Sequence, residues 1–184
     1  RRTAHAPVAS ADGYFLIQSG ATQAPQYEAF YSFVRGHGAT PQHPLPADTD
    51  DGIRFLGYDI LRQRDAGTQL VLYWVVTRQP ERDHFIQLYL LNERDEILGK
   101  TAYQQPALIW YPTSRWQTGE TVRVIANTLT WPEQPGRFSL GLAVLADDDP
   151  GKGEERLRWQ PVPGSPAPQL LEDETVLRLG EFGK

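Results

Sequence analysis

Residues 67–91, GTQLVLYWVVTRQPERDHFIQLYLL, are the stretch that decides the fold expected for this chain. Its two halves, 70–76 and 85–91, are mostly apolar, which is typical of strands with cover on a face and neighbours on their edges. Between them, residues 78–83 are charged and include a proline, as expected of a surface connection. The stretch therefore predicts two neighbouring strands in the core of a β-sandwich.

Strand signals continue on both sides. Large and small residues alternate over 138–144, which places the large ones on the core face and the small ones in a tight outer layer. The residues expected to face the core are Phe138, Leu140, Leu142 and Val144. Other strand candidates cover 14–18, 53–61, 97–103, 121–129, 157–159 and 175–179. With 16 glycines and 15 prolines to supply turns, the pattern favours a mainly β fold. We expect an antiparallel β-sandwich, either immunoglobulin-like or of the jelly-roll, carbohydrate-binding-module-like type.

One helix signal precedes these strands. Apolar and aromatic residues from Tyr27 to Val34 fall on a single stripe at helical spacing, and Gly36 follows as a stop signal. This N-terminal helix is expected to pack on the sheet. The expected organisation is a tail over 1–13, a strand–helix appendage over 14–38, a linker rich in proline and acid over 39–52, and the β-sandwich domain over 53–184.

The composition of the chain limits the classes of function that we consider for it. The formal net charge is -5 and no basic run stands out, which argues against a nucleic-acid partner. No apolar run approaches the ~18 residues of a membrane span, and no signal peptide is visible. Cysteine is absent, so disulfides and cysteine nucleophiles are excluded. Methionine is absent too, including at position 1, and we therefore expect the chain to derive from a longer reading frame.

The sequence offers little that suggests catalysis. No motif for a metalloprotease, a hydrolase nucleophile or nucleotide binding occurs. His84 begins a strand after Asp83 and is interpreted as a polar residue at a strand edge, not as a general base. The remaining histidines are expected to be solvated: His5, His37 and His43. The chain is therefore expected to be non-enzymatic and to need no cofactor.

Two acidic runs, 48–51 and 147–149, are the metal candidates. Carboxylates on loops can bind calcium, and Asp147 with Asp149 form the better pair. The alternative is that acidic turn residues solvate these loops and cap backbone amides. Neither run has the spacing of an EF-hand loop, so no metal site is expected.

Aromatic residues give the better binding candidate. Five of them lie in or beside expected loops, and the first four are the glycan-binding candidates: Trp110, Tyr111, Trp116, Trp131 and Trp159. Exposed rings can stack on a sugar, whereas rings at the end of a sandwich can instead plug its core. We expect Trp116 to be such a plug, and the pair Trp110–Tyr111 to be the first choice for glycan stacking.

Four sequence blocks occur in an order that suggests a family. They are Leu56–Asp59; Gly67 with Leu70–Trp74; Tyr111–Trp116, which reads YPTSRW, with Gly119–Glu120; and Pro135–Leu142 with Glu155–Leu157. Over residues 51–157 the chain resembles the β-sandwich domain at the extracytoplasmic C-terminus of bacterial multi-span membrane proteins related to family 39 glycosyltransferases, the protein mannosyltransferase-like group. The YPTSRW block is the most specific part of this resemblance.

The resemblance implies that the transfer chemistry resides in another, membrane-embedded part of the parent protein. The chain would then be an accessory ectodomain, tethered to the membrane, with glycan as a candidate partner. A second hypothesis is a structural or protein–protein interaction domain that uses an exposed sheet edge. A third, an enzyme, would require two carboxylates to converge in one cleft. The ligand and the oligomeric state stay open.

Overall fold

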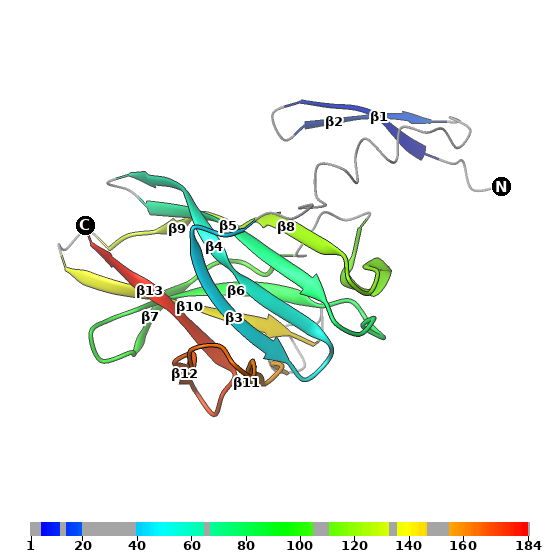
Figure 1. Ribbon diagram of the computed structural model, residues 1–184. Coiled ribbons are helices and arrows are strands. Elements are labelled where there is room, and N and C mark those ends of the chain that lie inside the picture. Colours follow the sequence, from blue (N-terminus) through cyan, green and yellow to red (C-terminus); the bar gives the residue numbers. More distant parts are fainter. Residues whose placement is uncertain are drawn as a thin grey trace.

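The chain is mainly β in the residues that the structure describes. The computed structural model describes the backbone over 5–11, 14–19, 40–64, 67–104, 111–132, 136–146 and 155–183. These residues form two large antiparallel sheets, of six and five strands, and a separate two-stranded hairpin (Figure 1). The expectation of a mainly β, antiparallel fold is confirmed.

The N-terminal hairpin corrects one boundary. β1 (His5–Ala11) and β2 (Tyr14–Ser19) pair antiparallel. The strand expected at 14–18 is therefore confirmed, whereas the tail expected over 1–13 is wrong for residues 5–11. The small residues of β1 carry little strand signal of their own, and it is the pairing with β2 that makes this segment a strand. The expected helix over Tyr27–Val34 lies outside the described residues.

The six-stranded sheet has the order β11-β3-β4-β5-β8, with β9 paired to the start of β5. The bounds are β3 (His43–Thr49), β4 (Ile53–Arg64), β5 (Gly67–Val76), β8 (Thr121–Ile125), β9 (Leu129–Thr130) and β11 (Trp159–Pro161). The linker expected over 39–52 is thus wrong, because it contains β3. The sheet tolerates Pro44 and Pro46 because β11 pairs only with residues 47–49 and the β3–β4 register shifts between Pro44 and Ala47.

The five-stranded sheet has the order β12-β13-β10-β6-β7. The bounds are β6 (Phe85–Leu91), β7 (Ile97–Lys100), β10 (Arg137–Leu145), β12 (Leu170–Leu171) and β13 (Val176–Gly183). A short 3-10 helix, η1 (Thr113–Arg115), precedes β8. The two strands expected as neighbours in 67–91 are both present, but β5 and β6 belong to different sheets. The charged connection between them passes from one sheet to the other instead of forming a hairpin within one.

One hydrophobic core joins the two sheets. It includes Phe55 and Trp74 from the six-stranded sheet and Leu88 from the five-stranded sheet, all at most 1% exposed. Trp74 stacks on Trp159, with ring centroids 6.3 Å apart. The expected inward phase of β10 is confirmed, because all four large residues belong to this core: Phe138, Leu140, Leu142 and Val144.

The outer face of the five-stranded sheet is also buried where β6, β10 and β13 meet. Tyr89, Ala143 and Val176 are each at most 1% exposed, and the Arg156 guanidinium lies over the Tyr89 ring at 5.0 Å. Gly141 is required here, since a Cβ atom would come within 2.7 Å of a Val176 methyl group. The small residues of β10 thus let neighbouring side chains approach closely.

Candidate functional site

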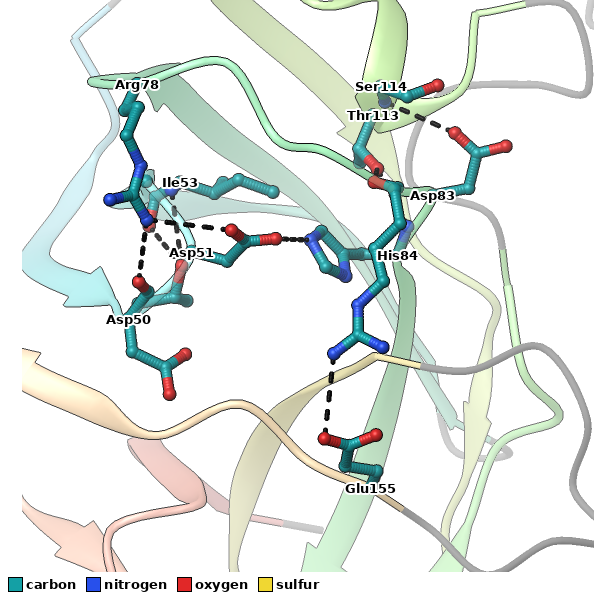
Figure 2. A network of polar contacts seen from close by, with 12 residues as sticks. Asp50, Asp51, Ile53, Arg78, Asp83, His84, Thr113, Ser114 and Glu155 are labelled. Atoms are coloured by element: carbon teal, nitrogen blue, oxygen red, sulfur yellow. Dashed lines mark hydrogen bonds and ion pairs between the residues drawn. The ribbon is translucent and has the colours of Figure 1, made fainter.

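Polar side chains gather at the end of the molecule where the β3–β4 turn, the β5–β6 connection and the η1 loop meet (Figure 2). The turn is closed by Thr49, whose hydroxyl donates to the Ile53 carbonyl at 2.9 Å and accepts from the Ile53 N–H at 3.2 Å. The Gly52 carbonyl accepts the N–H groups of Thr77 and Arg78 at 2.9 and 3.1 Å. These bonds hold the turn against the start of the β5–β6 connection.

Gly52 is the residue that permits this close approach. It has φ +80°, in the region that favours glycine, and a Cβ atom there would lie 2.5 Å from the Arg78 carbonyl oxygen. The backbone contact fixes the position of the preceding residue, Asp51.

Asp51 contacts His84, with 2.6 Å between a carboxylate oxygen and Nε2. The His84 side chain is completely buried, and the Asp51 side chain is 23% exposed. The backbone N–H of His84 donates to the Thr113 hydroxyl at 2.7 Å, and that hydroxyl donates to the Arg82 carbonyl at 3.3 Å. The interpretation of His84 as a strand-edge polar residue is therefore wrong: its ring is buried and joins two segments that are 33 residues apart in sequence.

Burial lowers the pKa of His84 below its ordinary value. The hydrogen bond and the charge of Asp51 act in the opposite direction, and the charge of Arg82 adds to the lowering. The net lowering keeps the buried ring uncharged at neutral pH. A neutral ring that donates to Asp51 fixes the loop without burying a second charge.

A cavity of about 540 Å³ lies beside this pair. It is polar, and its lining consists of Asp50, Asp51, Glu81, Arg82, Glu155, Arg156 and Leu157. Arg82 approaches Glu155 at 3.6 Å, and Arg78 approaches Asp51 at 3.6 Å (Figure 2). Both arginine side chains are more than half exposed, so these contacts contribute little to stability.

The His84 ring is not placed to exchange a proton with a molecule in this cavity. Nε2 already contacts Asp51, and the ring is closed off from solvent. The nearby Thr113 hydroxyl contacts backbone groups and makes no bond to the imidazole. The cavity does bring four carboxylates of three segments together, which sequence reasoning missed. In the sequence, the Asp-Asp-Gly turn at 50–52 was the only local signal of this carboxylate cluster.

The YPTSRW block, Tyr111–Trp116, and the following Gly-Glu turn form a loop closed on itself. The Tyr111 hydroxyl donates to the Glu120 carboxylate, which also accepts the Gln117 N–H at 3.1 Å. The Trp116 indole N–H donates to the Tyr111 carbonyl at 3.0 Å, and the Gly119 N–H donates to the Val76 carbonyl at 2.7 Å. Side chains and backbone of this block therefore seal the end of β5.

Three of the four predicted glycan-stacking residues are core residues. Tyr111 is 4% exposed, Trp116 0% and Trp131 5%. Trp131 stacks on Phe138, with ring centroids 5.9 Å apart. The prediction that Tyr111, Trp116 and Trp131 offer stacking faces is wrong, because their rings are packed in the hydrophobic core and are not exposed to a ligand. The expectation that Trp116 plugs the core is confirmed.

The other predicted site residues divide between exposed and undescribed positions. His43 lies on β3 with an exposed side chain, and its ring stacks on Tyr58 at 4.8 Å. Trp110, the calcium candidates Asp147 and Asp149, and His37 lie outside the described residues. Within the described ranges, no group of three or more histidines and acids could hold a metal ion.

Comparisons with known proteins found no matching family model, no similar curated protein and no matching solved structure. In the part of the chain that the structure describes, no helix is both long enough and apolar enough to cross a membrane.

Proposed function

We propose that this chain is a non-catalytic accessory domain with a β-sandwich architecture. In this proposal it belongs to the extracytoplasmic part of a bacterial membrane protein related to family 39 glycosyltransferases. Its task is to hold a partner or to position other parts of that protein, while the transfer reaction takes place elsewhere. In the same proposal, the sandwich is either immunoglobulin-like or of the jelly-roll type.

The observation that carries this proposal is the use made of the YPTSRW block. Its tyrosine hydroxyl, its threonine hydroxyl and its indole N–H all bond to groups of the same end of the molecule. A block whose buried side chains bond in this way serves the architecture rather than a reaction. The most specific part of the resemblance is therefore a scaffold signature, which fits an accessory domain.

A protein partner is favoured over a glycan held by ring stacking. Burial removes Tyr111, Trp116 and Trp131 as stacking faces. The edge strand β7, in contrast, exposes two large apolar residues, Ile97 at 38% and Leu98 at 51%. An exposed, apolar sheet edge is a surface on which another chain can pair.

The experiment is a topology measurement on the parent protein. Its reading frame upstream of Arg1 is sequenced, and a reporter active only outside the cytoplasm is fused after Lys184. The proposal expects several apolar segments of ~20 residues upstream and an active reporter. A reporter that is inactive there but active when fused to an exported control, or a frame without apolar segments, contradicts the setting.

A second measurement addresses the accessory role. Residues 40–184 are deleted from the parent protein, and the remaining protein is assayed with a small soluble acceptor. An accessory domain predicts that the transfer chemistry survives the deletion, whereas complete loss in a correctly inserted protein would assign catalytic groups to this chain.

A further inference from the structure

The β1–β2 hairpin stands apart from the two large sheets in its strand pairing. Among the described strands, β1 and β2 pair only with each other, as a sheet of two strands (Figure 1). An isolated two-stranded hairpin is at best marginally stable in water, and further strands are normally needed for a stable sheet. The hairpin is therefore an incomplete sheet, and one of its edges is expected to receive another strand.

The sequence of β2 is that of a strand inside a sheet. By the two-residue alternation of a strand, Tyr14 and Leu16 fall on one face and Phe15 and Ile17 on the other, so large apolar positions occur on both faces. A strand at a solvated edge normally alternates between apolar and polar positions, whereas a continuous apolar run is typical of a strand within a sheet. Because β2 has β1 on one edge only, its other edge lacks the neighbour that this sequence favours.

The two outer edges of the hairpin differ in how they are shielded. β1 contains Pro7, which has no backbone N–H, and its register shifts between Pro7 and Ala9. A proline and an irregular ladder both hinder the addition of a strand. β2 has no proline, no charged residue and no register shift of its own. The addition of a strand is therefore hindered at the edge of β1 and open at the free edge of β2, named here the β2 edge.

The outer strands of the two large sheets are better shielded than β2. β8 carries the charged Arg123, and the Gln104 carboxamide bonds to its C-terminal end, donating to the Ile125 carbonyl at 2.7 Å and accepting the Asn127 N–H at 2.6 Å. β7 has four residues, carries Lys100 and has a register shift of its own. The other two outer strands, β11 and β12, have three and two residues. The β2 edge, with six residues, is longer than those of β7, β11 and β12 and, unlike that of β8, has no charge.

Charge favours a second copy of this chain as the occupant of the β2 edge. The formal net charge is -5, so contact between two copies is least unfavourable at an uncharged surface. The two strands of the hairpin contain no lysine, arginine, aspartate or glutamate. β2 is also complementary to itself, since an antiparallel pair centred on Leu16 places Leu16 opposite its copy and Phe15 opposite Ile17. Such pairs of large apolar residues stabilise neighbouring strands.

We propose that the β2 edge pairs antiparallel with the β2 edge of a second copy, with the two-fold axis at Leu16. The resulting sheet has the order β1-β2-β2-β1, so the incomplete hairpins of two copies become one four-stranded sheet. Both of its outer strands are β1, whose edge is shielded by Pro7 and by the register shift. Assembly therefore stops at two copies, as expected of an isologous contact. This dimerisation goes beyond the accessory role proposed above and does not depend on the membrane setting.

Sedimentation velocity on the purified chain, over a range of concentrations, is the first measurement. We expect monomers at low concentration and dimers at high concentration. Leu16→Lys places like charges opposite each other at the axis and should raise the Kd of the dimer at least tenfold, and Leu16→Glu should do the same. An equimolar mixture of the two variants should recover the dimer, because Lys then lies opposite Glu. The control Leu61→Lys, at a 45% exposed position on β4, should dimerise like the parent chain.

Single cysteines locate the axis, because the chain has no cysteine of its own. Opposite residues of antiparallel strands have Cα atoms about 4.5–5.5 Å apart, which is within reach of a disulfide. Leu16→Cys should therefore form a covalent dimer under mild oxidation, detected on a non-reducing gel. The matched control is Gln18→Cys on the same strand. Its two copies are offset by four residues, or about 13 Å along the strands, and should stay unlinked.

Several results would overturn the proposal. A chain that is monomeric at every concentration would leave the β2 edge to a strand from another protein or from residues of this chain outside the described ranges. Dimers that Leu16→Lys does not weaken, or that the mixture of the two charged variants does not recover, would place the contact elsewhere. Equal cross-linking of Leu16→Cys and Gln18→Cys would exclude an axis at Leu16. Growth of fibres instead of dimers would mean open-ended stacking of strands.

Discussion

The two ends of this domain differ in whether their polar side chains are buried and hydrogen-bonded or exposed to solvent. At the η1 end, formed by the β3–β4 turn, the β5–β6 connection and the loop 111–120, buried polar groups bond to one another, in two cases across segments far apart in sequence and in a third within the loop 111–120. At the β7 end, the guanidinium groups of Arg94 and Arg137 line the same cavity as exposed Leu98 and make no hydrogen bond or ion pair with the described residues. The first end is therefore expected to contribute more to stability than the second.

The difference has a physical basis. A polar group withdrawn from water needs an internal partner, and losing that partner costs the full desolvation of the group left behind. A solvated guanidinium needs no such partner, so it can be kept free for another molecule at little cost to the fold. Substitutions at the two ends should consequently differ in their effect on stability, and four measurements test this difference.

The largest effect is expected for Trp116→Ala. The indole is completely buried and bonded to the Tyr111 carbonyl, so its removal leaves a cavity and an unpaired carbonyl. The free energy of unfolding should fall by about 3–5 kcal/mol, measured by urea denaturation. Ile125→Ala, at a 43% exposed position on β8, is the control and should cost far less. A small loss for Trp116→Ala would mean that the η1 end does not stabilise the core.

Asp51→Asn should have the next largest effect. It removes the charge that faces the buried His84 ring, while the neighbouring exposed Asp50 offers a matched control, Asp50→Asn. We expect a loss of about 1–2 kcal/mol for Asp51→Asn and less than about 0.5 kcal/mol for Asp50→Asn. Equal effects of the two substitutions would show that the contact with His84 contributes nothing specific.

The pH dependence of stability gives a third comparison. The pKa of His84 is lowered on folding, so below pH ~6.5 the unfolded chain binds more protons than the folded one. The stability contribution of the neutral ring is therefore complete above that pH and is lost as the pH falls toward the lowered folded-state pKa. The slope from this one group is at most about 1.4 kcal/mol per pH unit.

Urea denaturation at pH 7.5 and pH 5.5 measures this slope, with His84→Gln as the reference. The parent domain should lose stability on acidification, and the variant should lose less over the same interval. A parent domain that gains stability at pH 5.5 relative to the variant would mean that Asp51 holds the ring charged, contrary to the lowered pKa.

The smallest effect on stability is expected at the β7 end. Arg94→Ala and Arg137→Ala remove side chains without partners among the described residues, so each should change the free energy of unfolding by less than about 0.5 kcal/mol. Thermal melting of the two variants beside Asp51→Asn makes the comparison within one experiment. A destabilisation of 2 kcal/mol or more, about the size of the Asp51 effect, would erase the distinction between the two ends.

Local sequence patterns predicted where the strands lie better than which strands pair with one another. The alternation in β10 identified the core face correctly, because side chains of a strand point to opposite faces with a period of two. The apolar halves of 67–91 were both strands, yet their assignment to different sheets did not follow from the sequence. Sheet membership depends on which distant strands pair, and β10 rather than β5 is the partner of β6.

The candidate sites show the same limit. Aromatic residues in loops predicted either stacking faces or core plugs, and only the packing of Trp116 and Trp131 decided for the core. His84 followed a charged connection and was interpreted as a surface residue, because its partners Asp51 and Thr113 are distant in sequence.

The sequence by itself determined that the chain is built of short antiparallel strands, since strand period and turn residues are properties of neighbouring positions. Only the tertiary structure decided that β3 completes a sheet, that the aromatic loop closes the core and that His84 is paired in the interior. Those outcomes depend on burial and on hydrogen bonds between segments brought together by folding, and no local pattern encodes them.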